Sequence, residues 1–301
     1  MAIKTILVPL DGSRLSETVL PYASMMAEKN QARLVLFHVI ERHPPNTIHG
    51  ERHLTDQQEA STYLSEIIRS LPPQVPAEHH LHTESEEDVA DSIVAHSKEL
   101  HVDLIAMCAH GQSGLQKRFF GNIAQQVLSM GDVPVLLISP EKELQDKSCT
   151  CNCILVPLDG NPDHEAGLDM AAELALTCQA RVHLVMVIHR LSTLPAEQAA
   201  AAVLLPTAAS ELLEMSLQEG RLYLAQLMKK LVAQHIPVTG EVQRGDPARQ
   251  IVHAAKRFQA DVIVLGTHGK TAMDAFWSGS VTPKIATQTH LPLLLVPVHD
   301  G

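Results

Sequence analysis

The chain repeats itself, and this repeat constrains the fold more than any other feature of the sequence. The stretch TILVPLDGS from Thr5 returns as CILVPLDGN from Cys153, and QARLVLFHVI from Gln31 returns as QARVHLVMVI from Gln179. Both pairs are 148 positions apart, so the first parts of the two copies align without a gap. In a chain of 301 residues, this repeat predicts two copies of one domain, each large enough for its own core.

The repeat continues to the end of each copy, with one insertion. VDLIAMCAHG from Val102 pairs with ADVIVLGTHG from Ala260, and VPVLLIS from Val133 pairs with LPLLLVP from Leu291, now 158 positions apart. The second copy therefore carries ten extra residues in its middle, the difference between 158 and 148. Because the chain turns polar and loses its periodicity between the copies, we expect domains at residues 1–145 and 152–301.

Short, continuous apolar runs alternate with segments of helical spacing in both copies. In the first copy the runs are residues 6–10, 34–40, 104–107 and 133–138. Such runs are typical of buried parallel strands joined by crossover helices. The sequence therefore predicts an α/β fold with an open, helix-covered parallel sheet in each copy. The alternative is one continuous sheet through the whole chain.

Composition limits the kinds of binding partner and the cellular location that we expect for this chain. With a net charge of −11 and no cluster of Lys and Arg, we expect no binding to nucleic acid. No segment approaches the roughly 20 apolar residues that span a bilayer, so we expect no membrane span. The five cysteines are odd in number and do not form a disulfide framework, which favours a reducing, cytoplasmic location.

Two groups of potential metal ligands are weaker signals. Cys149, Cys151 and Cys153 could form a soft metal or redox site, but their spacing is not the CxxC of zinc knuckles, and Cys153 should enter a buried strand. A reduced linker or core role is the alternative. Residues 79–82 form a histidine-rich run from His79 to His82, but no second pair of potential metal ligands accompanies it. We therefore assign no metal ligand.

A glycine-rich loop follows the apolar run of the second copy that corresponds to residues 104–107 of the first. Its spacing is G-x2-G-x9-G-S, formed by Gly266, Gly269, Gly279 and Ser280. Glycines let phosphate oxygens reach backbone N–H groups, and the helix expected from about Val281 adds a favourable dipole. The loop is neither a P-loop nor a GxGxxG motif. Since ligands of open α/β sheets bind beyond the carboxyl ends of strands, this loop and Asp159 should face one crevice.

Together, the tandem ILVPLDG openings, the matching second runs and the G-x2-G-x9-G-S loop resemble the universal stress protein family, in its form with two domains in one chain. The resemblance covers nearly all of both copies, and four segments fall in the same order. It implies a Rossmann-like, five-stranded parallel sheet in each copy, of the adenine nucleotide alpha hydrolase type. It also implies ATP, with Mg2+, as the ligand of members that carry the full loop.

The resemblance implies a nucleotide contact at every matching position of the second copy. Asp159 would lie at the adenosine end, and Val187 would contact adenine through its backbone. The residues implied around the ribose and phosphates are Gly266, Gly269, Gly279 and Ser280, with Val281 directly after them.

The first copy departs from this pattern. It keeps Asp11, Val39, Gly111 and Gly121, and it has Lys117 and Arg118 inside the loop. Cys108 stands where the second copy has Gly266, and Asn122 stands where it has Ser280. A Cβ at position 108 should crowd the path of the ligand. We therefore expect the first site to be weakened or retuned to another anion.

These observations predict a cytoplasmic stress-response protein whose second copy holds ATP and whose contacts with a protein partner depend on occupancy. One alternative is a slow, Mg-dependent ATPase, although no general-base pair can be assigned from the sequence. Another is a metal or redox sensor built on the CxCxC linker. Because the family's domains pair through their final strands, the two copies should form an intramolecular pseudo-dimer, and a homodimer of whole chains stays open.

The ten extra residues fall within a segment rich in alanine and leucine, residues 194–230. Pro195 and Pro206 divide it, which predicts a short helix, a bend and a long helix from about Ala208. The segment follows Val187, so it could act as a lid over the base, or pack on the other copy or on a second chain. The alternative is a helix that merely extends into the existing core.

Overall fold

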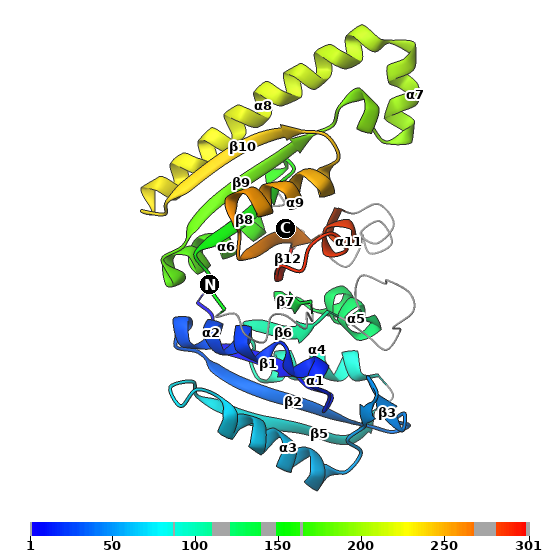
Figure 1. Ribbon diagram of the computed structural model, residues 1–301, viewed down its shortest axis with the longest axis vertical. Coiled ribbons are helices and arrows are strands. Elements are labelled where there is room, and N and C mark those ends of the chain that lie inside the picture. The colour runs from blue at the N-terminus through cyan, green and yellow to red at the C-terminus, as the bar shows by residue number, and fades with distance from the viewer. Residues whose placement is uncertain are drawn as a thin grey trace.

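The computed structural model describes residues 2–86, 88–109, 121–139, 149–162, 165–267 and 281–298. Strands from both copies form one ten-stranded sheet in the order β10-β9-β8-β11-β12-β7-β6-β1-β2-β5, and a separate two-stranded hairpin is formed by β3 and β4. Figure 1 shows the first half of the chain at one end of this sheet and the second half at the other.

The first half supplies five strands of the large sheet, the hairpin and the helices that connect them. Its strands are β1 (Thr5–Pro9), β2 (Arg33–Glu41), β3 (Thr47–Ile48), β4 (Glu51–Arg52), β5 (Ala77–Glu86), β6 (Leu104–Cys108) and β7 (Val135–Ile138). Its helices are α1 (Arg14–Glu17), α2 (Leu20–Asn30), α3 (Gln57–Ser70), α4 (Val89–Glu99) and α5 (Asn122–Met130).

In its described residues, the second half repeats this order without the hairpin. Its strands are β8 (Cys153–Leu158), β9 (Arg181–Ile188), β10 (Val238–Arg244), β11 (Val262–Thr267) and β12 (Leu293–Pro297). Its helices are α6 (Ala166–Cys178), the 3-10 turn η3 (Leu191–Thr193), α7 (Ala196–Leu204), α8 (Pro206–Ala233), α9 (Pro247–Phe258) and α11 (Val281–Ala286).

Within each half all strand pairs of the large sheet are parallel, and the two halves meet in an antiparallel pair between β7 and β12. The paired residues are Leu137 with Leu293, Leu136 with Leu294, and Val135 with Leu295. The predicted α/β fold with a five-stranded parallel sheet in each half is confirmed, and so is the pairing of the final strands. Hydrogen bonds across this pair also make the sheet continuous, which the sequence had left as an alternative.

Two apolar layers cover the sheet, one on each face. Helices α2, α3, α6 and α8 pack on one face, and α4, α5, α9 and α11 pack on the other. Each layer runs through both halves: Leu136 and Leu294 belong to the first, and Leu137 and Leu293 to the second. Parallel strands need cover on both faces because their side chains are apolar on both sides. The junction of the halves is thus buried as deeply as the rest of the sheet.

The sequence repeat produces the same local bonds in each half. A carboxylate oxygen of Asp103 accepts a hydrogen bond from the backbone N–H of Thr5 at 3.0 Å, where β1 begins. Asp261 does the same for Cys153 at 3.0 Å, where β8 begins. Each aspartate therefore satisfies a donor at the start of a central strand and fixes the register of that strand beside its neighbour.

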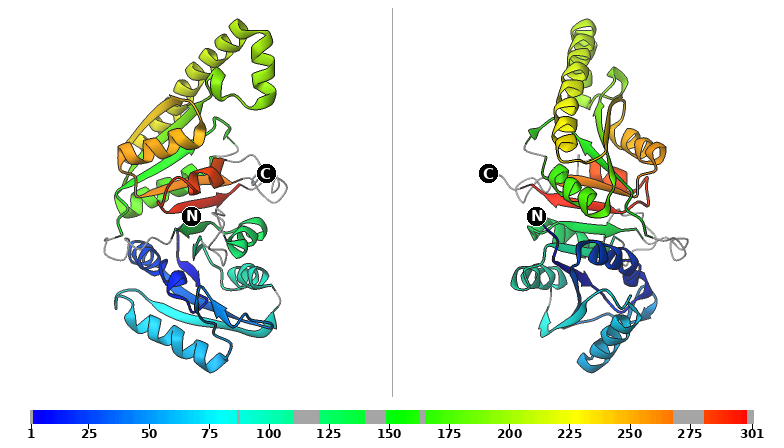
Figure 2. Two further views of the ribbon diagram at one scale, coloured as in Figure 1. Left: turned by 45° about the vertical axis from the view of Figure 1, so that its right-hand side comes forward. Right: turned by 90° about the vertical axis from the view of Figure 1, so that its left-hand side faces the viewer.

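The predicted helix, bend and long helix are present after β9. The bend lies at Leu205, between α7 and α8. The later part of α8 packs on β9 and β10 through buried leucines, whereas α7 and the start of α8 project beyond the sheet (Figures 1 and 2). Exposed apolar side chains on the projecting part are Val203, Leu204, Leu205, Leu212 and Met215. In neither figure does this part lie on the first half.

Taken over the ranges that the structure covers, no helix combines the length and apolar character needed to cross a membrane.

Burial places His183 of β9 in an environment that disfavours its charged form. The side chain stacks on Phe258, its Nδ1 lies 2.7 Å from the hydroxyl of Thr239, and its Nε2 lies 3.6 Å from the carboxylate of Glu241. Loss of hydration lowers its pKa, although Glu241 acts in the opposite direction. Burial also lowers the pKa of His53 and of His80.

These lowered values predict that proton uptake by the histidines destabilises the fold in mild acid. The unfolded chain takes up protons on these histidines from pH 6.5 downward, but the folded chain does so only at lower pH. The free energy of unfolding should therefore hold above pH 6.5 and fall as the pH drops below it. Urea unfolding at steps between about pH 8 and about pH 5.5 measures this fall.

The first half supplies the control, because Val35 stands where the second half has His183. His183→Val should reduce the loss of stability between these pH values. An unchanged slope in the variant would show that His183 is not one of the groups responsible.

Candidate functional site

The strand order reverses once in each half, between the first and fourth parallel strands. In the second half β9 and β10 lie on one side of β8, whereas β11 and β12 lie on the other. The equivalent pair in the first half is β1 and β6. Ligands of open α/β sheets bind beyond the carboxyl ends of strands at such a point. The structure thus places Asp159, which follows β8, and Gly266, near the end of β11, at the same edge of the sheet.

The turn after β8 has a backbone form that requires glycine. The carboxylate of Asp159 accepts a hydrogen bond from the backbone N–H of Asn161 at 2.9 Å, and Gly160 between them has a φ of +88°. A Cβ on Gly160 would lie 2.9 Å from the terminal methyl carbon of Met186. The positive φ disfavours any residue with a Cβ here, and a Cβ would also force the end of the Met186 side chain to move, so the backbone of this turn forms the surface at the carboxyl end of the sheet.

Helix α6 approaches β11 closely at the fourth strand. A Cβ on Gly167 would lie 2.8 Å from the backbone nitrogen of Gly266. Backbone therefore packs on backbone, with no side chain between helix and strand at this point. In the first half the equivalent positions are Val19 and Cys108. The close packing of α6 on β11 thus requires a glycine beside Gly266, at position 167, whether or not a ligand binds. The sequence alone did not reveal this contact.

The rest of the predicted glycine loop lies outside the described residues. This applies to Gly269, Gly279 and Ser280 in the second half, and to Gly111, Lys117 and Arg118 in the first. Val281 is described: it is the first residue of α11, half-buried against the apolar layer on that face. The phosphate contacts of the loop therefore stay a prediction.

Val187 has a position that suits a backbone contact. The ladder between β8 and β9 ends at the pair Leu158 and Met186, so Val187 is the first residue of β9 beyond it. On its other side Val187 pairs with Gln243 of β10. The side of the Val187 backbone that faces β8 therefore lies at the carboxyl end of the sheet, where the strand order reverses.

Two polar residues that sequence reasoning missed lie next to Val187. Arg244 ends β10 opposite Ile188 and forms an ion pair with Glu214 of α8 at 2.8 Å. Its Nε is buried and has no hydrogen-bond partner within the described residues, and the same holds for Nδ1 of His189. Buried polar atoms without partners are costly unless something else satisfies them. The sequence feature that could have pointed to Arg244 is its difference from the first half, which has Glu86 at the equivalent position.

In the first half, the hairpin of β3 and β4 lies on the corresponding turn. Nε2 of His49 is 3.5 Å from the carboxylate of Asp11, and the carboxylate of Glu51 accepts a hydrogen bond from the backbone N–H of Arg14 at 3.3 Å. A Cβ on Gly12 would lie 2.7 Å from carbon atoms of the Leu54 side chain. The chain itself therefore covers the turn that follows β1.

Asp11 also accepts hydrogen bonds from a residue of its own turn. Its carboxylate accepts hydrogen bonds from the backbone N–H of Ser13 at 2.9 Å and from the hydroxyl of Ser13 at 2.6 Å. In the same half, Gly121 caps α5 with a φ of −62°, an extended conformation open to any residue. Glycine at 121 is therefore not required by the backbone.

The cysteines of the CxCxC linker do not converge. Cys151 belongs to the apolar layer that contains α6, whereas Cys153 belongs to the layer on the opposite face of the sheet. Among the described residues, no group of three or more His, Cys, Asp or Glu side chains is arranged to hold a metal ion. His82 instead contacts His96, with 2.8 Å between Nδ1 and Nε2.

Comparison with known proteins agrees with both the repeat and the fold. The universal stress protein family model matches the chain twice, at residues 2–139 and 152–297. A universal stress protein of Methanocaldococcus jannaschii is 30% identical over 145 residues, which cover 48% of this chain and 80% of that protein. One from Mycolicibacterium smegmatis is 23% identical over 300 residues, 97% of this chain and 96% of that protein.

Solved structures show the same architecture over the full length. The crystal structure of a universal stress protein from Archaeoglobus fulgidus matches with a TM-score of 0.67 and 17% identity, covering 98% of this chain and 97% of that one. A structure from Pseudomonas aeruginosa matches with a TM-score of 0.64, covering 98% and 94%. With two family matches in tandem and the corresponding fold, the chain belongs to the universal stress protein family.

Proposed function

We propose that this chain is a cytoplasmic ATP-binding module whose second half, residues 152–301, holds the nucleotide with Mg2+, and whose first half, residues 1–145, does not hold it comparably. ATP would lie across the carboxyl ends of β8, β9 and β11. Its occupancy would change the contacts of the protein with a partner, so that the module acts in signalling rather than in turnover.

The observation that carries this proposal is the difference between the two aspartate turns. Both carboxylates accept a hydrogen bond at 2.9 Å from the backbone N–H two residues further on. That of Asp11 also accepts from the hydroxyl of Ser13 and lies within 3.5 Å of His49, beneath a hairpin of its own chain. The second half has no hairpin among its described residues, and its chain leaves β9 through η3 and α7 instead. A ligand would have to displace the hairpin in the first half, but not in the second.

The described residues of the second half fit the adenosine part of ATP. Asp159 can accept from ribose hydroxyls, and the edge of Val187 beyond the β8 ladder is suited to contact a base through backbone atoms. The buried Nδ1 of His189 and Nε of Arg244 could be satisfied by a polar ligand at this end. Bound Mg2+ would neutralise phosphate charge, next to a loop that lies outside the described residues.

Equivalent substitutions in the two halves test the asymmetry. Asp159→Ala should weaken ATP binding about tenfold to a hundredfold, because it removes a charge-assisted hydrogen bond. Asp11→Ala should leave ATP affinity unchanged and lower the free energy of unfolding by about 1 kcal/mol, because it removes acceptors for Ser13. Titration calorimetry with ATP and urea unfolding measure the two effects.

A second pair of equivalent substitutions tests the glycine loop that we expect at the phosphate end of the nucleotide. Gly279→Val should abolish ATP binding, whereas Gly121→Val should leave most of it, since φ at Gly121 is within reach of valine. Equal losses of affinity from the two members of either pair would contradict the proposal.

The ion pair between Arg244 and Glu214 offers a route from the nucleotide to the surface. Arg244 borders the base end of the crevice, and Glu214 lies on the projecting part of α8, near the exposed side chains of Leu212 and Met215. A ligand that accepts a hydrogen bond from Nε of Arg244 would fix this side chain while its ion pair with Glu214 stays in place, and would thereby hold the start of α8 more firmly. Because exposed apolar side chains in a group are typical of interaction surfaces, the projecting part is where occupancy would be communicated.

Hydrogen exchange can show whether this segment responds to the nucleotide. Amides in residues 194–213 should become more protected when ATP is added, because a ligand beside Arg244 would order the start of α8. Mass spectrometric detection of exchange, with and without ATP, measures the change.

Glu214→Gln is the matched control, since it removes the charge of the ion pair and keeps the shape of the side chain. It should bind ATP and show a smaller change in protection than the unmodified chain. An identical exchange pattern with and without ATP would mean that α7 and the start of α8 serve only as an extended helix.

A further inference from the structure

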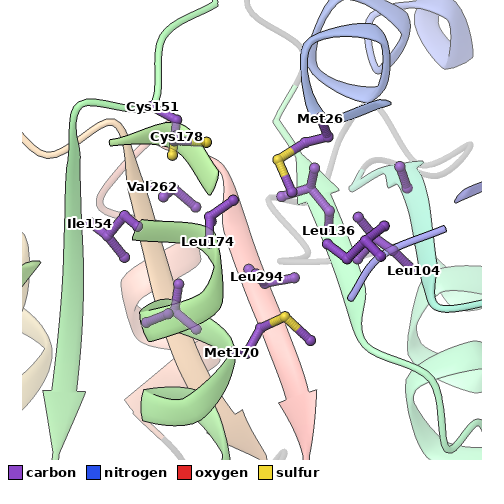
Figure 3. Close-up of a cluster of buried hydrophobic side chains, with 14 of the residues drawn as sticks. Met26, Leu104, Leu136, Cys151, Ile154, Met170, Leu174, Cys178, Val262 and Leu294 are labelled. Atoms are coloured by element: carbon purple, nitrogen blue, oxygen red, sulfur yellow. The ribbon is translucent and has the colours of Figure 1, made fainter. Parts of the chain in front are cut away.

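Two thiols from different parts of the second half meet in the apolar layer on one face of the sheet. Cys151 lies just before β8, and Cys178 is the last residue of α6. Figure 3 shows their sulfur atoms side by side, and a thiol hydrogen bond joins them. Both cysteines are free thiols in the structure. The exposed fractions of the two residues are 7% and 8%.

This pair differs from the linker site that the sequence suggested. Cys153, two positions along the chain from Cys151, faces the opposite side of the sheet and packs with the layer of α9 and α11. Cys149 is half-buried before the strand. The partner of Cys151 therefore comes from α6, 27 positions away in the sequence, and not from the CxCxC run.

The two thiols are not equivalent in their acidity. The hydrogen bond from Cys151 lowers the pKa of Cys178, and the ammonium group of Lys29 acts in the same direction. The same hydrogen bond, together with burial, raises the pKa of Cys151. The carboxyl end of α6 disfavours a negative charge, so the thiolate of Cys178 depends on Cys151 and on Lys29. Lys29 belongs to α2 of the first half, which packs beside α6.

The first half has no counterpart of the pair. Ile3 and Asn30 occupy the equivalent positions, where Ile3 is buried and the amide of Asn30 donates a hydrogen bond to the backbone oxygen of Met26 at 2.8 Å. The framework of this half therefore folds without any thiol at these places. A structural need of the fold does not explain why the second half has two.

We propose that Cys151 and Cys178 form a redox-active dithiol that a small hydroperoxide oxidises to a disulfide. The adjacency of the two sulfur atoms is what a disulfide needs, since bridging requires neighbouring side chains that point toward each other. A small oxidant suits the slight exposure of both residues better than a protein disulfide does.

The hydroperoxide oxidises the dithiol in two steps. The thiolate of Cys178 attacks one oxygen of the hydroperoxide; a sulfur–oxygen bond forms, the oxygen–oxygen bond breaks, and the leaving alkoxide takes a proton to become an alcohol. Cys151 then loses its proton, and its sulfur attacks the sulfenic acid; the sulfur–sulfur bond forms and hydroxide leaves to become water. Two thiols are oxidised to one disulfide, and the hydroperoxide is reduced to an alcohol and water, or to two molecules of water when it is hydrogen peroxide.

Peptide mapping of the full chain tests this directly and needs no variant. The reduced protein is treated with hydrogen peroxide, free thiols are alkylated, and the digest is analysed without and with dithiothreitol. We expect a cross-linked pair of peptides that contains Cys151 and Cys178 and disappears on reduction. A link between Cys149 and Cys151 or Cys153 instead, or irreversible oxidation of Cys178 while Cys151 stays free, would overturn the proposal.

Variants add two readouts that a purely structural role would not move. Cys149→Ser should form the same disulfide to the same extent, whereas Cys151→Ile, which installs the residue of the first half, should leave Cys178 with no disulfide. Lys29→Ala should slow oxidation several-fold, because it removes the positive charge that favours the Cys178 thiolate. An unchanged rate in Lys29→Ala would contradict the assignment of Cys178 as the attacking thiol.

Discussion

The antiparallel pair of β7 and β12 is the interaction on which the rest of the structure depends. Each half ends in an apolar strand that would be an exposed sheet edge if the half stood alone. Pairing Leu136 with Leu294 satisfies the backbone groups of both edges and joins the apolar layers on both faces. The tandem chain therefore carries its own partner for this edge. Joining the halves in this way also places Lys29 of one half near Cys178 of the other.

The two halves keep the framework and differ in the connections. Asp103 and Asp261 fix the same strand start, and the hydroxyls of Tyr63 and Tyr223 donate to Glu17 and Glu165, which are equivalent residues of the repeat. The connection directly after the second strand differs: a hairpin folds back on the aspartate turn in the first half, but η3 and α7 lead away from it in the second. The functional asymmetry that we propose rests on this one connection, because it decides whether the crevice is covered by the chain.

Apolar periodicity and the repeat predicted the α/β class, and two prolines in an apolar helical segment predicted the helix–bend–helix of residues 194–230. The pairing of the final strands was expected only from the resemblance to the universal stress protein family. The hairpin over Asp11 could not be predicted, because two-residue strands leave no periodicity. The contact of Cys151 with Cys178 could not be predicted either, since it arises from how α6 crosses the sheet. Arg244, the last residue of β10, differs from its counterpart Glu86 in the first copy, but only the structure shows its ion pair with Glu214.

The central claim is that one half of the chain holds the nucleotide, and the binding stoichiometry tests this most directly. Native mass spectrometry of the whole chain with increasing ATP and Mg2+ counts the nucleotides on each molecule without any substitution. The account predicts that one ATP binds per chain and that a second does not follow at comparable concentration. Two nucleotides bound with similar affinity would contradict the asymmetry between the halves, and no bound nucleotide at saturating ATP would contradict the proposed function itself.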